Sequence, residues 1–170
     1  MEIEIKPSGQ LTPQEKQQLD DLAADAFPPD EIDFEWAEVD WFVIVREGAE
    51  LVSNVEIIER QAVVAGTPVR LGGIGGVATR TAWRRRGFAE AALKVAQSFM
   101  RRRLAVDYGL LICSEQLVPY YGKLGWQVVA GPMLIEQAGG QVTYSAPIMV
   151  LPVCKKDWPE GVIDLCGKPW

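Results

Sequence analysis

The sequence contains no histidine and three cysteines among its 170 residues, and these shortages exclude several kinds of site. Without histidine the chain has no Ser-His-Asp or Cys-His nucleophile system and no histidine-ligated zinc or haem. Any general base must therefore be Asp, Glu, Tyr, Lys, Cys or a water molecule. The cysteines are Cys113, Cys154 and Cys166, and they form no C-x-x-C pair. This spacing predicts no metal site and no disulfide framework, and a reducing compartment is the simplest interpretation.

The sequence also lacks a long uncharged apolar run and an excess of basic residues. No such run reaches the ~18 residues of a membrane-spanning helix, and the first residues do not resemble a signal peptide. The 17 Lys and Arg are outnumbered by 23 Asp and Glu, which gives a formal net charge of -6. General nucleic-acid binding normally uses a basic surface. We therefore expect a cytoplasmic protein that binds neither membranes nor nucleic acid, and a cationic substrate suits its charge.

The charged residues are segregated along the chain. Residues 20–40 contain nine acids and no Lys or Arg, whereas residues 84–103 contain seven basic residues and one acid. If both segments border one cleft, one end attracts cations and the other attracts anions. The alternative is that most of these charges lie on solvated faces of the protein.

The hydrophobic pattern predicts one mixed α/β domain with helices packed on a single sheet. A chain of this length buries roughly 70% of its extended surface on folding, and 48% hydrophobic residues suffice for one core. We expect one domain over residues 1–170, with weakly specified segments at 131–141 and in the tail after residue 152. The expected strands are 2–6, 41–46, 51–60, 69–79, 108–113, 126–129 and 143–150, and the expected helices are 13–27, 88–103 and 119–124.

The predicted strand 69–79 is unusually rich in glycine, with Gly72, Gly73, Gly75 and Gly76. Glycine weakens the interior of a strand. Its presence there marks either a β-bulge or the close approach of another group to the backbone.

The most informative segment is 76–89, where this strand ends, a short connection follows and a helix begins. Arg84, Gly87 and Ala89 form the pattern Arg-x-x-Gly-x-Ala at the helix start. A helix start offers about four unpaired N–H groups and a positive dipole end, and small residues there allow a phosphate to approach. The pattern therefore indicates a diphosphate site. It is not a P-loop, which requires Gly-Lys-Ser/Thr, and the glycines lie too early for a dinucleotide fold.

A second segment strengthens this interpretation. Residues 114–126 contain an aromatic-Tyr pair, Tyr120-Tyr121, followed by Gly125-Trp126. Together the two segments resemble the GNAT superfamily of acyl-CoA N-acyltransferases, and the resemblance covers nearly the whole chain. It implies a mixed, mostly antiparallel central sheet flanked by helices. It also implies that the sheet splays at the acetyl-CoA cleft, where strands 69–79 and 108–113 part.

The resemblance implies a role for each motif. The backbone of Val77, Ala78 and Thr79 would pair with the pantetheine arm of acetyl-CoA, the acyl donor. Tyr121 would be the general acid that protonates the departing thiolate, and Ser114 would hold the pantetheine or assist Tyr121. The pyrophosphate would be held by Arg84, Arg85, Arg86, Gly87, Phe88 and Ala89.

The chemistry of amide formation is consistent with these roles. Attack of an amine on a thioester needs donors for the oxyanion and a proton donor for sulfur. A phenol with a pKa near 10 suits a thiolate with a pKa near 8.5. Residues 71–77 contain no acid to act as base, so we consider Glu56, Glu59 and Glu115, each of which we expect at a surface or edge. A water relay or an amine that arrives neutral is the alternative.

Within the superfamily the chain is most similar to the aminoglycoside 2'-N-acetyltransferases. Acids and the carboxylate of a terminal Trp hold the polyamine sugar in that subgroup, so the resemblance implies substrate contacts for Asp33, Glu35, Trp36 and Trp170. The chain departs from the subgroup where Gly75 replaces a Glu and where Lys168 adds a positive charge. We therefore favour another small molecule with a primary amine over an aminoglycoside.

Two classes of function follow from the sequence. The first is an N-acetyltransferase that transfers acetyl from acetyl-CoA to a small amine. The second is a non-catalytic acyl-CoA-binding module. Retention of Tyr121 favours the enzyme, whereas the missing strand Glu favours the module. The resemblance is also compatible with a homodimer.

Overall fold

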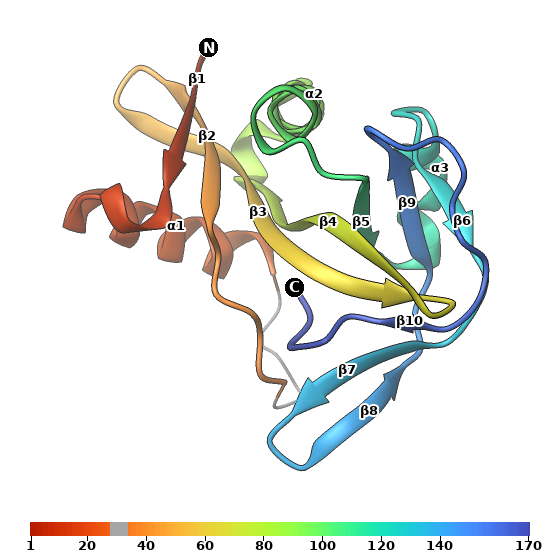
Figure 1. Cartoon of the computed structure of the whole chain (residues 1–170). Helices are drawn as coiled ribbons and strands as arrows, with labels where there is room; N and C mark the ends of the chain where they lie inside the picture. The colour runs from red at the N-terminus through yellow and green to blue at the C-terminus, as the bar shows by residue number, and fades with distance from the viewer. Residues whose placement is uncertain (28–33) are drawn as a thin grey trace.

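The computed structural model describes residues 1–27 and 34–170, and the strands in these ranges form one sheet (Figure 1). Its main path runs β6-β9-β5-β4-β3-β10-β7-β8, and β1 and β2 extend it from β3. Neighbouring strands are antiparallel except for the pairs β4–β5 and β7–β10. The strands are β1 (Glu2–Pro7), β2 (Trp41–Glu47), β3 (Glu50–Val64), β4 (Thr67–Thr79), β5 (Tyr108–Ile112), β6 (Gln127–Val129), β7 (Met133–Gln137), β8 (Gly140–Tyr144), β9 (Ile148–Pro152) and β10 (Ile163–Asp164).

The sequence pattern predicts most of these elements, but it is wrong near the C-terminus. The expected strand 143–150 is two strands, because the chain leaves β8 at Tyr144 and re-enters the sheet in β9 at Ile148. Pro147 lies in this break, where it lacks the N–H that a central strand would need. The segment 131–141, expected to be irregular, contributes β7 and the start of a hairpin with β8.

Helices cover both faces of the sheet. Helix α2 (Phe88–Phe99), continued by a π-helical turn (Met100–Leu104), packs on one face. Helix α1 (Pro13–Ala26) packs on β3 and β4 from the other face, beside the last residues of the chain (Figure 1). The short helix α3 (Val118–Gly122) follows β5. None of the helices in the two described ranges is long and apolar enough to cross a membrane.

Helix α1 is tied to the sheet by the carboxylate of Glu15. Its Oε2 accepts the Thr12 N–H at 2.9 Å, and Thr12 Oγ1 accepts the Glu15 N–H at 3.2 Å, which completes a capping box. Glu15 Oε1 also accepts from Lys6 Nζ at 2.7 Å and from Arg46 Nη2 at 3.1 Å. These contacts, led by the hydrogen bond from Lys6, lower the Glu15 pKa from 4.5 to about 2. They fix the helix whose last turn borders the cavity described below.

The glycines of β4 allow close packing on both faces of the strand. A Cβ at Gly72 would lie 2.4 Å from Met100 Sδ, on the α2 face. A Cβ at Gly73, which points to the opposite face, would lie 2.2 Å from Cε2 of Trp170. The close approach expected from the sequence is therefore made by one side chain on each face.

The C-terminal residues complete the second face of the sheet. Ile163 lies in β10, which pairs with β3 and β7, and Ile163 and Leu165 are fully buried. The Trp170 indole is 9% exposed, and its Nε1 donates to the Leu110 carbonyl at 3.1 Å. Part of the tail after residue 152 is thus built into the core, because it contacts strands that lie far away in the sequence.

Strands β4 and β5 separate towards one end. Their pairing runs from Leu71–Tyr108 to Ile74–Leu111 and then stops, although β4 continues to Thr79. Between Asn54 and Glu56, the register of β3 with β4 shifts by one residue, so β4 carries a bulge near Gly76. The N–H and C=O groups of residues 75–79 on the β5 side are left without a neighbouring strand.

We predict that Gly73→Ala destabilises the protein by roughly 1–3 kcal/mol, the usual cost of overpacking a core. The added methyl must displace the Trp170 indole. The free energy of unfolding from urea titration measures the effect. The control is Gly139→Ala, because a Cβ at Gly139 meets nothing within 4 Å. Equal stability of the two variants would contradict this packing.

We predict that Glu15→Gln lowers the free energy of unfolding by roughly 2 kcal/mol at neutral pH, because it weakens charge-assisted hydrogen bonds. The folded-state pKa lies below the ordinary value of 4.5, so this stability is present above about pH 4.5. It is lost as the pH falls towards about 2. Urea titrations of both proteins between pH 7 and 3 test this. Glu4→Gln removes an exposed carboxylate near the same lysine and should have a much smaller effect. A stability difference that does not change with pH would contradict the assignment.

Candidate active site

A cavity of about 730 Å³ lies where β4 and β5 separate. Its volume is in the range of small-molecule sites. It is bordered by the end of α1, strands β3, β4 and β5, the segment before α3, and the end of the chain. The described residues that line it are Ala23, Ala24, Phe27, Trp36, Ala37, Glu56, Ile58, Ile74, Gly75, Gly76, Val77, Ile112, Cys113, Leu117, Tyr121 and Trp170.

Glu56 is the charged side chain among the described lining residues. Its neighbours on β3, Val55 and Ile57, point into the α2-side core, so Glu56 points to the other face. It pairs in register with Gly75, and a Cβ at Gly76 would lie 2.2 Å from the Glu56 carboxyl carbon. Burial raises the pKa of Glu56. The expectation of a surface or edge charge is therefore wrong for this residue, because the glycines leave room for its carboxylate inside the cavity.

Tyr121 lines the same cavity from α3. Its side chain is 6% exposed, and its ring packs against Tyr120 and Trp126 at centroid distances of 5.1 and 6.5 Å. Burial strongly raises the pKa of the phenol, which therefore stays protonated at neutral pH. The neighbouring Cys113 thiol is also buried, and burial raises its pKa. Both groups are neutral and able to donate a proton.

Ser114, the other candidate from the sequence, follows β5 but does not line the cavity. It is exposed, and its carbonyl accepts the Leu117 N–H at 3.0 Å at the start of the short 3-10 turn Glu115–Leu117. The structure does not bring the Ser114 side chain into the set of residues around Glu56 and Tyr121.

The end of β4 presents its backbone to the gap. Val77 lines the cavity and packs against the α2-side core, whereas Ala78 packs against α1. On the β3 side, Ser53 Oγ donates to the Ala78 carbonyl at 2.7 Å and lies 2.9 Å from Thr79 Oγ1. These bonds hold one edge of the strand and leave the other edge open.

Helix α2 begins just beyond this edge at the N-cap Gly87, whose φ of 83° is readily adopted by glycine. No side chain caps the helix start, so its first N–H groups have no intrahelical or side-chain acceptor. The acid of the first turn, Glu90, is paired with Lys94 at 2.6 Å. Phe88 is buried and Ala89 is partly exposed. An anion can therefore reach the start of this helix.

The three arginines before α2 are arranged differently from one another. The Arg84 guanidinium donates to the Thr79 carbonyl at 3.1 Å and to the Ala26 carbonyl at 3.5 Å. The Arg86 guanidinium lies 4.8 Å from the ring centroid of Trp83. Arg85 is exposed and has a φ of 60°. Arg84 thus braces the connection, whereas Arg85 keeps its charge on the surface.

The expected substrate residues fall into three groups. Trp36 and Trp170 line the cavity. Glu35 does not, because its carboxylate lies 3.6 Å from Lys168 Nζ and its backbone N–H donates to Gln137 Oε1 at 2.9 Å. Asp33 lies outside the described residues. In residues 1–27 and 34–170, no cluster of three Cys, Asp or Glu side chains is suited to a metal ion.

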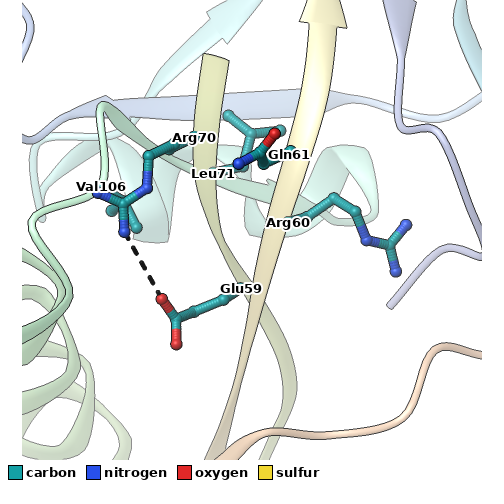
Figure 2. A pocket seen from close by; sticks show the side chains of 6 residues that line it. All are labelled: Glu59, Arg60, Gln61, Arg70, Leu71 and Val106. Carbon is teal, nitrogen blue, oxygen red and sulfur yellow. Dashed lines mark ion pairs between the residues drawn. The ribbon is translucent and has the colours of Figure 1, made fainter. Parts of the chain in front are cut away.

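A smaller hollow of about 190 Å³ lies elsewhere, near the far halves of β3 and β4. Figure 2 shows Arg70 directed towards Glu59, at a distance of 3.9 Å, and Arg60 directed away towards the end of the chain. Arg70 also donates to the carbonyls of Leu104 and Ala105, and Arg60 to those of Leu165 and Lys168. The cations that line this hollow are thus held by the Glu59 carboxylate or by backbone carbonyls.

Comparison with known proteins assigns the fold to a family. The model of the acetyltransferase (GNAT) domain matches residues 9–129. The chain belongs to this family. The match includes β4, the start of α2 and Tyr121, and it confirms the resemblance found in the sequence motifs.

Individual relatives are more distant. The aminoglycoside 2'-N-acetyltransferase of Mycolicibacterium fortuitum is 25% identical over 121 residues, which cover 70% of this chain. The match spans 61% of the length of that relative. This GNAT chain has the same fold as YhbS, a GNAT family N-acetyltransferase from Escherichia coli in complex with CoA. The TM-score is 0.67 at 12% identity, over 96% of this chain and 88% of YhbS. A Brucella melitensis GNAT acetyltransferase in complex with acetyl-CoA has a TM-score of 0.64 at 13% identity, over 95% and 94%.

The sequence names Glu56 as one of three candidate bases of this GNAT domain but predicts it at a surface or edge. One feature of the sequence could have indicated its position: an acid lies on one strand of a predicted hairpin, and glycines lie on the strand that follows. Whether the acid faces the glycines depends on the register of β3 against β4, and the bulge near Gly76 shifts this register by one residue. A one-residue change of register moves a side chain to the other face of a sheet. The motif alone therefore cannot say where the carboxylate points.

Proposed function

We propose that this protein is an N-acetyltransferase that moves an acetyl group from acetyl-CoA to a primary amine of a small molecule by direct attack on the thioester. The observation that carries the proposal is the presence of Glu56 and Tyr121 in one cavity, beside the open edge of β4. One side chain can accept a proton and the other can donate one. The cavity opens where family membership leads us to expect the thioester.

The residues around the gap fit acetyl-CoA as a substrate. The open N–H and C=O groups of residues 75–79 suit the amides of a pantetheine arm, and Val77, Ala78 and Thr79 carry most of them. The arm would lead from there to the start of α2, where unpaired N–H groups and the helix dipole favour a pyrophosphate. Gly87 and Ala89 leave room for the phosphate, with Arg85 in support. In this proposal Arg84 holds the connection between β4 and α2 and does not bind the phosphate.

Tyr121 supplies the proton for the departing thiolate in this mechanism. A buried phenol with a raised pKa is neutral over the working pH range and remains a donor. The thiolate that forms when the C–S bond breaks is more basic than water and accepts this proton. Direct attack also fits the absence of a histidine-based nucleophile from the sequence.

The acceptor class in this proposal is a small molecule with a primary amine. The similarity to an aminoglycoside 2'-N-acetyltransferase supports an amine acceptor. An aminoglycoside itself is the second candidate, and we place the reaction in the cytoplasm. A non-catalytic acyl-CoA-binding module is the alternative from another class of function.

The first test of the proposal measures release of free CoA thiol from acetyl-CoA with a panel of monoamines, polyamines, amino acids and aminoglycosides. Release that depends on one class of amine would support the enzyme. Binding of acetyl-CoA without release for any amine would favour the binding module. No binding of acetyl-CoA would overturn the proposal.

We predict that Tyr121→Phe lowers kcat roughly 100-fold or more, the usual effect of losing a general acid. The Kd of acetyl-CoA, measured by calorimetry, should stay within about twofold because the ring remains. Tyr120→Phe is the matched control, since it removes a neighbouring hydroxyl that does not line the cavity. Wild-type turnover by Tyr121→Phe would remove Tyr121 from the mechanism.

We predict that Ala89→Asp raises the Kd of CoA roughly tenfold, whereas Ala89→Asn raises it much less. A carboxylate in the first turn stabilises a helix, so weaker binding cannot be attributed to loss of the fold. It repels a pyrophosphate at the same position. Calorimetric titration of both variants with CoA measures the difference, and equal Kd values would place the pyrophosphate elsewhere.

A further inference from the structure

Two buried polar side chains lie next to each other on β3, opposite the end of β4. Ser53 and Asn54 are 0% and 3% exposed, and they pair in register with Thr79 and Ala78. The residues that flank Asn54 on its face of the sheet, Ile44 and Ala78, belong to the apolar cluster beneath α1. An amide in such surroundings is unfavourable unless its polar atoms are hydrogen-bonded.

The Asn54 amide is only partly satisfied. Its Nδ2 donates to the Gly76 carbonyl at 3.4 Å, whereas its Oδ1 has no hydrogen-bond partner among residues 1–27 and 34–170. A β-branched apolar residue would favour the strand and would leave no buried acceptor without a partner. Packing alone therefore does not explain an asparagine here. The one bond that the amide makes, to Gly76, indicates what it does.

This bond sets the direction of the peptide that joins Gly76 to Val77. The peptide is trans, since the described residues contain no cis bond, and its C=O and N–H therefore point in opposite directions. The Gly76 carbonyl is turned towards Asn54 on β3, so the Val77 N–H points towards the β5 side. Both residues lie in the bulge, where they face the single residue Val55, and a bulge interrupts the ladder. The side chain thus fixes a peptide that the ladder leaves less determined.

The hydrogen bonds beyond the bulge agree with this direction. The Arg80 N–H donates to the Val52 carbonyl of β3 at 2.9 Å. Every second residue of an antiparallel strand bonds to the same neighbour, so Ala78 also faces β3, whereas Val77 and Thr79 direct their backbone groups to the other side. The Thr79 carbonyl accepts from a guanidinium of the α2 connection at 3.1 Å. Val77 therefore presents both its N–H and its C=O to the gap between β4 and β5.

We infer that Asn54 is a positioning residue for the acyl-CoA. It touches no ligand, but it holds the Gly76 carbonyl on the β3 side and thereby directs the N–H and C=O of Val77 at the pantetheine arm. The inference rests on the proposed function and deepens it, because it names the residue that sets the edge on which the acyl donor binds. The unpartnered Oδ1 accompanies an amide donor that the site requires.

Asn54→Val tests this role, because it removes the donor and the unpartnered acceptor together. We expect the Kd of CoA, measured by calorimetry, to rise roughly three- to tenfold, the equivalent of one hydrogen bond. The Kd of 3'-phospho-ADP, the half of CoA without the pantetheine arm, should stay within about twofold. The midpoint of urea unfolding should not fall, because no unsatisfied amide is then buried. Ile44→Val, in the same apolar cluster, is the control and should change neither Kd.

Amide hydrogen exchange followed by NMR tests the geometry in the wild-type protein. The Val77 N–H faces the gap, so we expect it to exchange at least roughly tenfold faster than the Ala78 N–H in the free protein. Saturation with CoA should slow the exchange at Val77, and the slowing should be smaller in Asn54→Val. Equal protection of the two N–H groups in the free protein would overturn the inference.

The binding experiment has further decisive outcomes. An unchanged Kd of CoA in Asn54→Val would overturn the inference. A parallel rise of both Kd values, or a lower urea midpoint, would also overturn it, because Asn54 would then stabilise the fold in general. Failure of the proposed function is distinguishable from these results. Wild-type protein that does not bind CoA overturns both, whereas wild-type binding that the substitution leaves unchanged overturns only the role of Asn54.

Discussion

The structure depends on close contact between the backbone of β4 and side chains on both of its faces. Met100 approaches Gly72 from the α2 side, and Trp170 approaches Gly73 from the other side. Neither contact is compatible with a Cβ on the strand. Close packing of this kind fixes neighbouring elements within a fraction of an ångström. The core and the cavity therefore share the strand β4. Its glycines lower its propensity to form a strand, but they also make this close packing possible.

The same absence of side chains creates the site. After Ile74 the strand no longer pairs with β5, and its bulge near Gly76 shifts its register against β3. Glu56 occupies the space beside the bulge, and Tyr121 reaches the cavity from beyond β5. An acid and a phenol that are 65 positions apart in the sequence thus share one cavity. Tyr121 is buried and Glu56 is partly buried, and burial raises the pKa of each.

The sequence predicts those features that depend on local patterns. The capping box at Thr12, the helix start at Gly87 and the Tyr121 segment all lie within short stretches, and their elements are observed. Features that depend on long-range pairing were not predictable in this way. The inward direction of Glu56 follows from the register of β3, and the burial of Trp170 follows from its packing on β4 and β5.

The charge of the molecule and the chemistry of its cavity act over different distances. A net charge of -6 attracts cations through solvent. Two of the described acids near the cavity already have partners within the protein. Glu35 lies near Lys168, and Asp25 accepts the Thr81 N–H at 2.6 Å. Inside the cavity, Glu56 and the last residue, Trp170, lie together beside Gly75. A cation that enters loses part of its hydration, and this loss is offset only where a carboxylate receives the charge. Long-range attraction therefore acts on every cation near the molecule, whereas the position of the partly buried Glu56 carboxylate sets where in the cavity a positive charge is most favourable.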